Sequence, residues 1–156
     1  MKNHAAMRPK ESDPMSCAFN EARAAFERGE VPAGAVIVRD GAIISRAGNQ
    51  TLRDKDPTAH AEVLAIRRAC HAEESERLSG CDLYVTLEPC AMCAAAISFA
   101  RLRRLYFAAP DPKGGGVEHG PRFFAQPTCH HAPEIYGGIR ESEAAAMLTS
   151  FFMARR

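Results

Sequence analysis

The stretch CDLYVTLEPCAMCAAAISFARL, residues 81–102, changes from a strand pattern to a helix pattern at Pro89. Residues 81–88 are mostly apolar and include β-branched side chains, which is typical of a buried strand. Residues 90–102 are rich in alanine, the strongest helix former. The stretch therefore predicts a buried strand that Pro89 ends, followed at once by a helix.

Helices and strands alternate along the rest of the chain. Asp13 and Pro14 suit the cap and first turn of a helix that Gly29 ends. The Asp-Gly pair at 40–41 separates two β-branched runs and predicts a hairpin over 33–48. Further elements are expected at 61–72 (helix), 103–109 (strand), 132–138 (weak strand) and 141–156 (helix). This order predicts a three-layer α/β/α domain around a central mixed sheet.

Composition limits the class of protein. With 156 residues and 46% hydrophobic content, the chain suits one compact domain. We expect residues 1–13 to be a flexible extension and residues 14–156 to form the domain. The 20 basic and 19 acidic residues nearly balance, so any nucleic-acid surface must be local. The start resembles no signal peptide and no apolar run could span a membrane, so we expect a cytoplasmic protein.

Two cysteines at the start of the predicted 90–102 helix suggest a metal site. Cys90 and Cys93 lie three positions apart, about 300° around the helix axis, so that their sulfur atoms point the same way. A helix N-terminus lowers the pKa of a thiol and favours the thiolate that binds metal. The pair can therefore hold one ion.

A second helix start, TAHAE at residues 58–62, supplies a histidine and a carboxylate. In a regular helix His60 and Glu62 would be about 200° apart, so His60 should lie at or before the first turn with Glu62 turned inward. If the loop that carries His60 lies beside Cys90 and Cys93, one His and two Cys hold zinc and leave a fourth position free, as in catalytic sites. Glu62 could then move protons for an activated water, and Ala61 would leave room for substrate. The pattern H-x-E followed by P-C-x-x-C is the signature of zinc nucleobase deaminases.

Two other interpretations use the same residues. A CxxC after a strand also occurs in thioredoxin-like redox sites, although this chain has no Trp and its elements follow another order. A structural zinc module would need a fourth ligand, for which Cys129, His130 and His131 are candidates, and it would leave Glu62 idle. The same three residues could instead belong to a second metal site. Cys17, Cys70 and Cys81 are expected in the core.

Several longer segments together resemble the bacterial tRNA-specific adenosine deaminases of the cytidine deaminase-like superfamily. They are EVPAGAVIV (30–38), GNQ (48–50), DPTAHAE (56–62), LYVTLEPCAMCAAAI (83–97) and FFMARR (151–156). The resemblance covers about residues 15–156. It implies one Zn²⁺ per subunit, hydrolytic conversion of the wobble adenosine of a tRNA anticodon loop to inosine, an arginine tRNA as substrate, and a homodimer whose subunits share the RNA surface.

The resemblance also implies roles for individual residues. It assigns His60, Cys90 and Cys93 to zinc, Glu62 to proton transfer and Asn49 to the purine. It places Val31 and Pro32 in the pocket wall and Asp111 near the sugar. The chain differs from the family at Pro110, where Arg is frequent, and glycines 114–116 are expected to lengthen or loosen this loop.

The sequence offers several candidates for RNA contacts and more than one possible substrate. The candidates for phosphate contacts are Arg101, Arg103, Arg104, Lys113, Arg122, Arg140, Arg155 and Arg156. Phe151 and Phe152 could stack on bases or pack the last helix onto the core, and at least one is expected in the core. The nearest alternative function is a zinc deaminase acting on a free base or nucleoside such as guanine or cytosine. A non-catalytic, zinc-stabilised RNA-binding module is the other.

Overall fold

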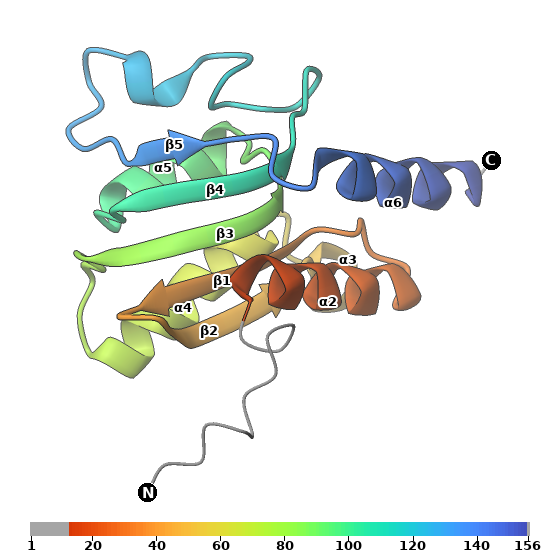
Figure 1. Ribbon diagram of the computed structural model, residues 1–156, viewed down its shortest axis with the longest axis horizontal. Coiled ribbons are helices and arrows are strands. Elements are labelled where there is room, and N and C mark those ends of the chain that lie inside the picture. Colours follow the sequence, from red (N-terminus) through yellow and green to blue (C-terminus); the bar gives the residue numbers. More distant parts are fainter. Residues whose placement is uncertain (1–12, 156) are drawn as a thin grey trace, which may run out of the picture.

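A computed structural model describes residues 13–155, which form one five-stranded sheet with helices on both faces (Figure 1). The strand order is β2-β1-β3-β4-β5, in which the β2-β1 and β1-β3 pairs are antiparallel and the β3-β4 and β4-β5 pairs are parallel. The strands are β1 (Gly34–Arg39), β2 (Ala42–Gly48), β3 (Cys81–Leu87), β4 (Arg104–Ala109) and β5 (Glu134–Tyr136). The helices are α2 (Pro14–Glu27), α3 (Thr51–Asp54), α4 (Ala61–Glu73), α5 (Ala91–Phe99), the 3₁₀ turn η2 (Phe123–Ala125) and α6 (Glu141–Met153).

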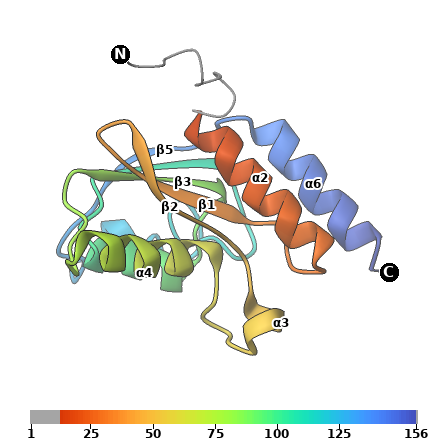
Figure 2. The ribbon, with the colours of Figure 1, turned by 90° about the horizontal axis from the view of Figure 1, so that it is seen from below.

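The sheet separates two apolar cores, as the three-layer prediction requires. Alternate side chains of β3 enter opposite cores: Leu83 and Val85 pack with α4 and α5, whereas Tyr84 packs with α2 and α6. Figure 2 shows α2 and α6 side by side on one face of the sheet, with α4 on the other. The rings of Phe26 and Phe151, 5.5 Å apart and edge to face, join α2 to α6. Phe151 is buried and Phe152 is exposed, which confirms that one of the pair belongs to the core.

Strand register brings distant parts of the chain to one edge of the sheet. Gly34 at the start of β1 pairs with Gly48 at the end of β2, and Leu87 at the end of β3 pairs with Ala109 at the end of β4. Because β1 runs antiparallel to β3, its beginning lies beside the end of β3. Segments 31–33, 49–51, 87–90 and 109–111 therefore meet at this edge, where the parallel strands end.

Local sequence signals placed most elements correctly. Asp13 caps α2 and Pro14 opens it, while Asp40 and Gly41 both have positive φ, as a hairpin turn of this kind needs. The predicted 90–102 helix is shorter in the structure, because α5 ends at Phe99 and Arg101 adopts a positive φ of 64°. Residues 1–12 of the expected extension lie outside the described residues. Within residues 13–155, no helix is both long and apolar enough to cross a membrane.

Candidate metal centre and active-site cavity

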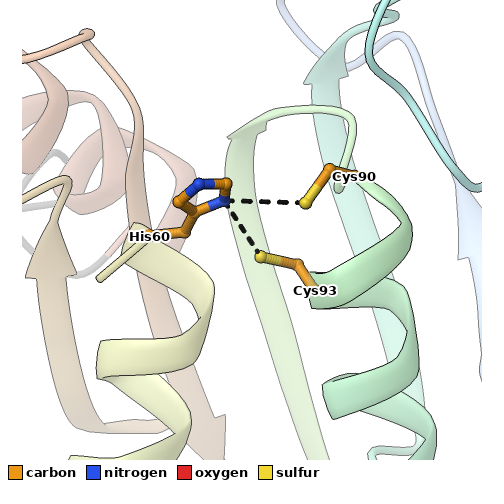
Figure 3. A group of neighbouring side chains, drawn as sticks. All are labelled: His60, Cys90 and Cys93. Carbon is orange, nitrogen blue, oxygen red and sulfur yellow. Dashed lines mark hydrogen bonds between the residues drawn. The ribbon is translucent and has the colours of Figure 1, made fainter. Parts of the chain in front are cut away.

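Two helix N-termini face each other at this edge and carry the candidate metal ligands. His60 is the N-cap residue of α4 and Cys90 is the N-cap residue of α5, and neither side chain makes a capping hydrogen bond. Ser, Thr, Asp or Asn would be the usual choice at such a position. The His60 and Cys90 side chains are instead directed toward Cys93, in the first turn of α5 (Figure 3). The predicted position of His60, just before the first helical turn, is therefore confirmed.

The distances between these three side chains suit a tetrahedral zinc ion. His60 Nδ1 lies 3.6 Å from Cys90 Sγ and 3.5 Å from Cys93 Sγ. Zinc bonds of about 2.0 Å to nitrogen and 2.3 Å to sulfur, at a tetrahedral angle, would separate the two ligand atoms by about 3.5 Å. In the described part of the chain, His60, Cys90 and Cys93 are the residues whose ligand atoms gather closely enough to hold an ion. The donor set therefore fits zinc with one coordination position left over.

The two thiols of the centre differ in acidity. The hydrogen bond from Cys93 and the nearby His60 ring lower the pKa of Cys90 to about 4, so Cys90 is a thiolate at neutral pH. The Cys90 sulfur and burial raise the pKa of Cys93 far above that of an ordinary thiol. Without metal, Cys93 therefore keeps its proton and shares it with Cys90. A cation between the sulfur atoms must displace this proton.

Glu62 lies beside the three ligands in the first turn of α4 and is 5% exposed. Burial raises the pKa of its carboxyl to about 7, and the negative charge of Cys90 adds to this rise. Its position in the first helical turn favours the ionised form, because backbone N–H dipoles point toward it. A carboxyl group with a pKa near neutrality can both accept and donate a proton under physiological conditions.

A cavity of about 310 Å³ opens onto this centre. Its walls include Glu62 and two candidate ligands, His60 and Cys90. Predicted pocket residues Val31, Asn49, Ala61 and Asp111 also line it, whereas Pro32 is buried and is not among the lining residues. The volume is at the lower end of the range for ligand sites and suits one nucleotide rather than a large ligand.

Four further lining residues have no role predicted from the sequence: Ala33, Thr51, Leu87 and Glu88. The signal that could have found Glu88 is an acidic residue at the end of a buried strand, directly before Pro89. Such a carboxylate must be ionised and well hydrogen-bonded, or else neutral. Burial alone would raise the pKa of Glu88, but hydrogen bonds from Asp111, His119 and neighbouring backbone groups outweigh burial and lower it.

A second buried carboxylate supports Asn49. Glu30 is 1% exposed, and its two oxygens accept hydrogen bonds from the backbone N–H groups of Leu52 at 3.1 Å and Arg53 at 2.8 Å. Glu30 thus accepts hydrogen bonds from the first turn of α3, whose own N-cap residue Gln50 makes no side-chain capping hydrogen bond. The Asn49 side-chain amide donates to the same carboxylate at 3.5 Å. Glu30 therefore helps to orient Asn49, which lines the cavity.

The glycine-rich segment is tightly packed, so the expectation that glycines 114–116 loosen the loop is wrong. A Cβ atom at Gly115 would lie 2.5 Å from the Glu88 carboxyl carbon, and one at Gly116 would lie 2.6 Å from the Ala91 nitrogen. The Gly116 N–H donates to the Pro89 carbonyl at 2.8 Å. Glycine is required here because the loop backbone lies directly against the junction of β3 and α5.

The candidate RNA-binding arginines fall into separate groups. Arg103 and Arg104 lie at the start of β4, about 16 Å along the strand from the edge that carries the cavity. Asp82 binds Arg103 through two hydrogen bonds, and Glu134 binds Arg104. Arg101 lies at this same distant end, since it follows α5 directly. Structural ion pairs therefore account for at least two of the three side chains.

Other candidates lie nearer to the cavity or elsewhere. Lys113 follows Asp111, and it lines a groove with Arg155, Leu148, Thr149, Phe152 and Met153. Arg140 binds Glu143 and Ser16, which joins α6 to α2. Arg122 is exposed before η2, and Arg156 lies outside the described residues.

The TCHH segment has structural contacts. Ser98 donates a hydrogen bond to the His131 carbonyl at 2.7 Å, and the His131 ring donates to the Leu102 carbonyl at 2.7 Å. Cys129 contacts Ser98 at 3.6 Å. These contacts lie at the C-terminal end of α5, whereas Cys90 and Cys93 lie at its N-terminal end. Cys129 and His131 thus attach the segment after η2 to α5 and stand apart from the candidate centre.

Comparison with known proteins agrees with this geometry. The family model of the cytidine and deoxycytidylate deaminase zinc-binding region matches residues 8–109. The tRNA-specific adenosine deaminase of Agrobacterium fabrum is 63% identical over 142 residues, which cover 91% of this chain and 93% of that protein. A solved structure from a study of A-to-I editing by tRNA:A34 deaminases at the wobble position of transfer RNA shares 64% identity with a TM-score of 0.86, over 86% of this chain and 98% of that one.

A guanine deaminase from Bacillus subtilis is more distant. It shares 32% identity and a TM-score of 0.62, over 99% of this chain and 94% of that one. The predicted cytidine deaminase-like fold is thus confirmed, and zinc is the cofactor that the matched region binds. The chain belongs to the tRNA-specific adenosine deaminases, within the family defined by the cytidine and deoxycytidylate deaminase zinc-binding region.

Proposed function

We propose that this protein converts the wobble adenosine of a tRNA anticodon loop to inosine by zinc-dependent hydrolysis. The observation that carries the proposal is that a His-Cys-Cys centre, an unligated buried carboxyl group and Asn49 share one nucleotide-sized cavity. The 63% identity to a tRNA-specific adenosine deaminase supports the choice of substrate. We assign this activity to a domain formed by residues 14–156.

In this proposal His60, Cys90 and Cys93 hold zinc and Glu62 moves protons. Zinc, when bound, supplies a water molecule activated for attack near neutral pH. Glu62 takes a proton as the water oxygen bonds to C6 of adenine, and it gives that proton to the ring nitrogen N1. It then assists the transfer of a second proton to the amino group, so that the C6–N bond breaks and ammonia leaves. A carboxyl pKa near 7 suits both steps.

The cavity would receive a single base flipped out of the loop. Asn49, oriented by Glu30, can hydrogen-bond the polar edge of the purine, and Val31 can pack against its face. Ala61 keeps the floor between His60 and Glu62 open, and Asp111 lies where the sugar would enter. Pro32 supports this wall from a buried position.

Replacement of Asn49 by alanine tests the recognition of the base. We expect catalytic efficiency on a wobble-adenosine stem-loop to fall roughly 10- to 100-fold, since one or two hydrogen bonds to the base are lost. Zinc content should remain that of the wild type. The measurement is steady-state kinetics with metal analysis, and Asn20→Ala, a change at an exposed position of α2, is the control. Unchanged kinetics in Asn49→Ala would remove Asn49 from the substrate site.

We assign RNA docking to the groove beside the cavity. Lys113 and Arg155 provide positive charge, and Phe152, 52% exposed, provides a ring on which a base can stack. Arg101, Arg103 and Arg104 lie at the far end of the sheet and serve as an internal comparison.

A salt titration distinguishes the two groups. We expect the double variant Lys113→Ala, Arg155→Ala to bind the stem-loop more weakly and to have a salt dependence shallower by about 1 to 2 in log–log slope, because two phosphate contacts are lost. Arg101→Ala should change neither quantity. The reverse result, a shallower slope only in Arg101→Ala, would place the RNA at the opposite end of β4.

Assembly, exact substrate and location are proposed on the same basis. We propose a homodimer, consistent with the exposed apolar side chains of Leu52 (70%) and Phe99 (74%), which a partner could cover. We further propose an arginine tRNA as substrate and the cytoplasm as location, as the family resemblance implies. Sedimentation and a comparison of several adenosine-34 tRNAs test the first two.

The decisive experiment offers the zinc-loaded protein a wobble-adenosine stem-loop and, in parallel, free adenosine, guanine and cytidine. We expect inosine and ammonia only from the stem-loop. Deamination of guanine with an untouched stem-loop would transfer the function to the class of the Bacillus subtilis relative. Binding of the stem-loop without any deamination would favour a non-catalytic RNA-binding module.

A further inference from the structure

Glu88 holds the loop of residues 111–119, which borders the cavity. Its side chain has 0% exposure, and its Oε2 atom accepts hydrogen bonds from three successive backbone N–H groups, Val117 at 3.1 Å, Glu118 at 2.8 Å and His119 at 3.2 Å. Three consecutive donors converging on one oxygen form an anion nest built from backbone. Here the anion is a side chain of the protein itself, so the nest fixes the loop to the end of β3.

The other oxygen of Glu88 binds the opposite end of the same loop. Its Oε1 atom accepts the Asp111 N–H at 2.9 Å and lies 2.8 Å from His119 Nδ1. The Asp111 carboxylate in turn accepts the Gly114 N–H at 2.9 Å, and both Asp111 and Gly114 line the cavity. One buried carboxylate thus ties the loop's beginning to its end.

All acceptor positions of Glu88 are in use. A carboxylate offers about four lone-pair sites, and five donors surround this one. Glu88 therefore has no acceptor left for substrate or metal, although it borders the cavity. Any effect on the reaction must pass through the loop it holds.

We propose that Glu88 is a positioning residue that holds the rim loop, residues 111–119, in a preformed conformation for the sugar side of the substrate nucleotide. This inference rests on the proposed function for the identity of the substrate. The loop is then a fixed wall of the site, because a mobile loop would have to break the Glu88 contacts and the packing of Gly115 against that side chain. Substrate binding would not need to order it.

Glu88→Gln separates the two ends of the loop. If the amide oxygen faces Val117, Glu118 and His119, the amide nitrogen faces the Asp111 N–H, and a donor meets a donor. The His119 ring can adapt by changing tautomer, but the Asp111 N–H cannot. The variant should therefore release the Asp111 end of the loop and keep the 117–119 end.

Hydrogen–deuterium exchange measures this directly in the zinc-loaded protein without substrate. We expect peptides that contain Asp111 to exchange at least tenfold faster in Glu88→Gln, with little change at 117–119. Gly115→Ala, which places a Cβ against the Glu88 carboxyl group, should accelerate exchange across the whole rim loop. The matched control is Glu118→Gln, which neutralises an exposed carboxylate in the same loop and leaves its backbone donor in place. Wild-type exchange in both Glu88→Gln and Gly115→Ala would overturn the proposal.

Kinetics distinguish positioning from a general structural role. We expect KM for the stem-loop to rise roughly tenfold in Glu88→Gln, with kcat and zinc content unchanged. The contact that is lost is that between the Asp111 end of the rim loop and the sugar, which would be made equally in the ground state and the transition state. Loss of zinc, or a fall in kcat at constant KM, would show that Glu88 acts through the metal centre and would contradict the proposal. If the wild-type protein leaves the stem-loop untouched, the proposed function fails, while the exchange data still decide the role of Glu88.

Discussion

Glu62→Ala is expected to lose deamination by roughly 10²- to 10⁴-fold or more while it keeps its fold and its zinc. General acid–base groups typically contribute factors of this size, and Glu62 would act in more than one proton transfer. The side chain is not one of the three ligands, so its removal leaves the His60, Cys90 and Cys93 contacts in place. The measurement combines single-turnover product analysis with metal analysis and circular dichroism.

The control for this variant is Glu76→Ala, which removes an exposed carboxylate after α4. Its turnover should equal that of the wild type. Undiminished deamination by a folded, metal-loaded Glu62→Ala protein would contradict the assignment of Glu62 as the proton-transfer residue. It would leave the centre as a structural element of an RNA-binding module.

The buried carboxyl group of Glu62 should also lower the free energy of unfolding of the metal-free protein at neutral pH. The pKa of its carboxyl is about 7 in the fold against an ordinary value of 4.5, so the folded state holds the proton more tightly than the unfolded state. The contribution of Glu62 to the stability of the metal-free protein therefore falls by roughly 3 kcal/mol as pH rises from 4.5 to 7. Metal-free Glu62→Gln should be more stable than the wild type above pH 7 and similar to it below pH 4.5. Urea unfolding in a chelator at both pH values provides the measurement.

Cys93→Ala is expected to abolish both zinc binding and deamination. Loss of one of three ligands leaves two donors for an ion that structural and catalytic sites hold with at least three protein ligands. Metal analysis should fall from near one zinc per chain to almost none. The thermal midpoint should drop toward that of chelator-treated wild type, because a bound metal stabilises only the folded state.

Cys70→Ala is the matched control for the thiol. Cys70 lies in α4, half-buried against the core of that layer and outside the candidate centre. Its zinc content and activity should equal those of the wild type. A Cys93→Ala protein that still holds one tightly bound zinc would show that another residue completes the site.

Secondary structure was well predicted wherever a local signal was strong. Asp13-Pro14, Asp40-Gly41 and Pro89 each mark a boundary that the structure confirms. The short helix α3 carries no such signal in its own sequence, because its cap comes from Glu30 across the fold. The prediction for the end of α5 was wrong for a related reason. Residues 100–102 continue a helix-like composition, but α5 ends at Phe99 and the chain turns, so that Leu102 is buried in the same core as Leu83 and Val85.

The sequence by itself determined the chemistry of the centre. The spacing of Cys90 and Cys93, the helix start at His60 and the short distance from His60 to Glu62 are properties of neighbouring residues, and a helix fixes their relative directions. Local geometry was therefore enough to predict that Cys90 and Cys93 point the same way and that Glu62 turns inward from His60, whereas the meeting of His60 with the two cysteines, 30 and 33 residues away, depends on the tertiary structure.

Only the tertiary structure decided what surrounds that centre. Strand register brings Asn49, Glu88 and Asp111 to one edge of the sheet, and hydrogen bonds between segments more than 18 residues apart orient them. The same register carries Arg103 and Arg104 to the opposite end and pairs them with Asp82 and Glu134. The physical reason is that burial and hydrogen-bond partners depend on which distant segments meet, and a single chain's local pattern does not encode the positions of those partners.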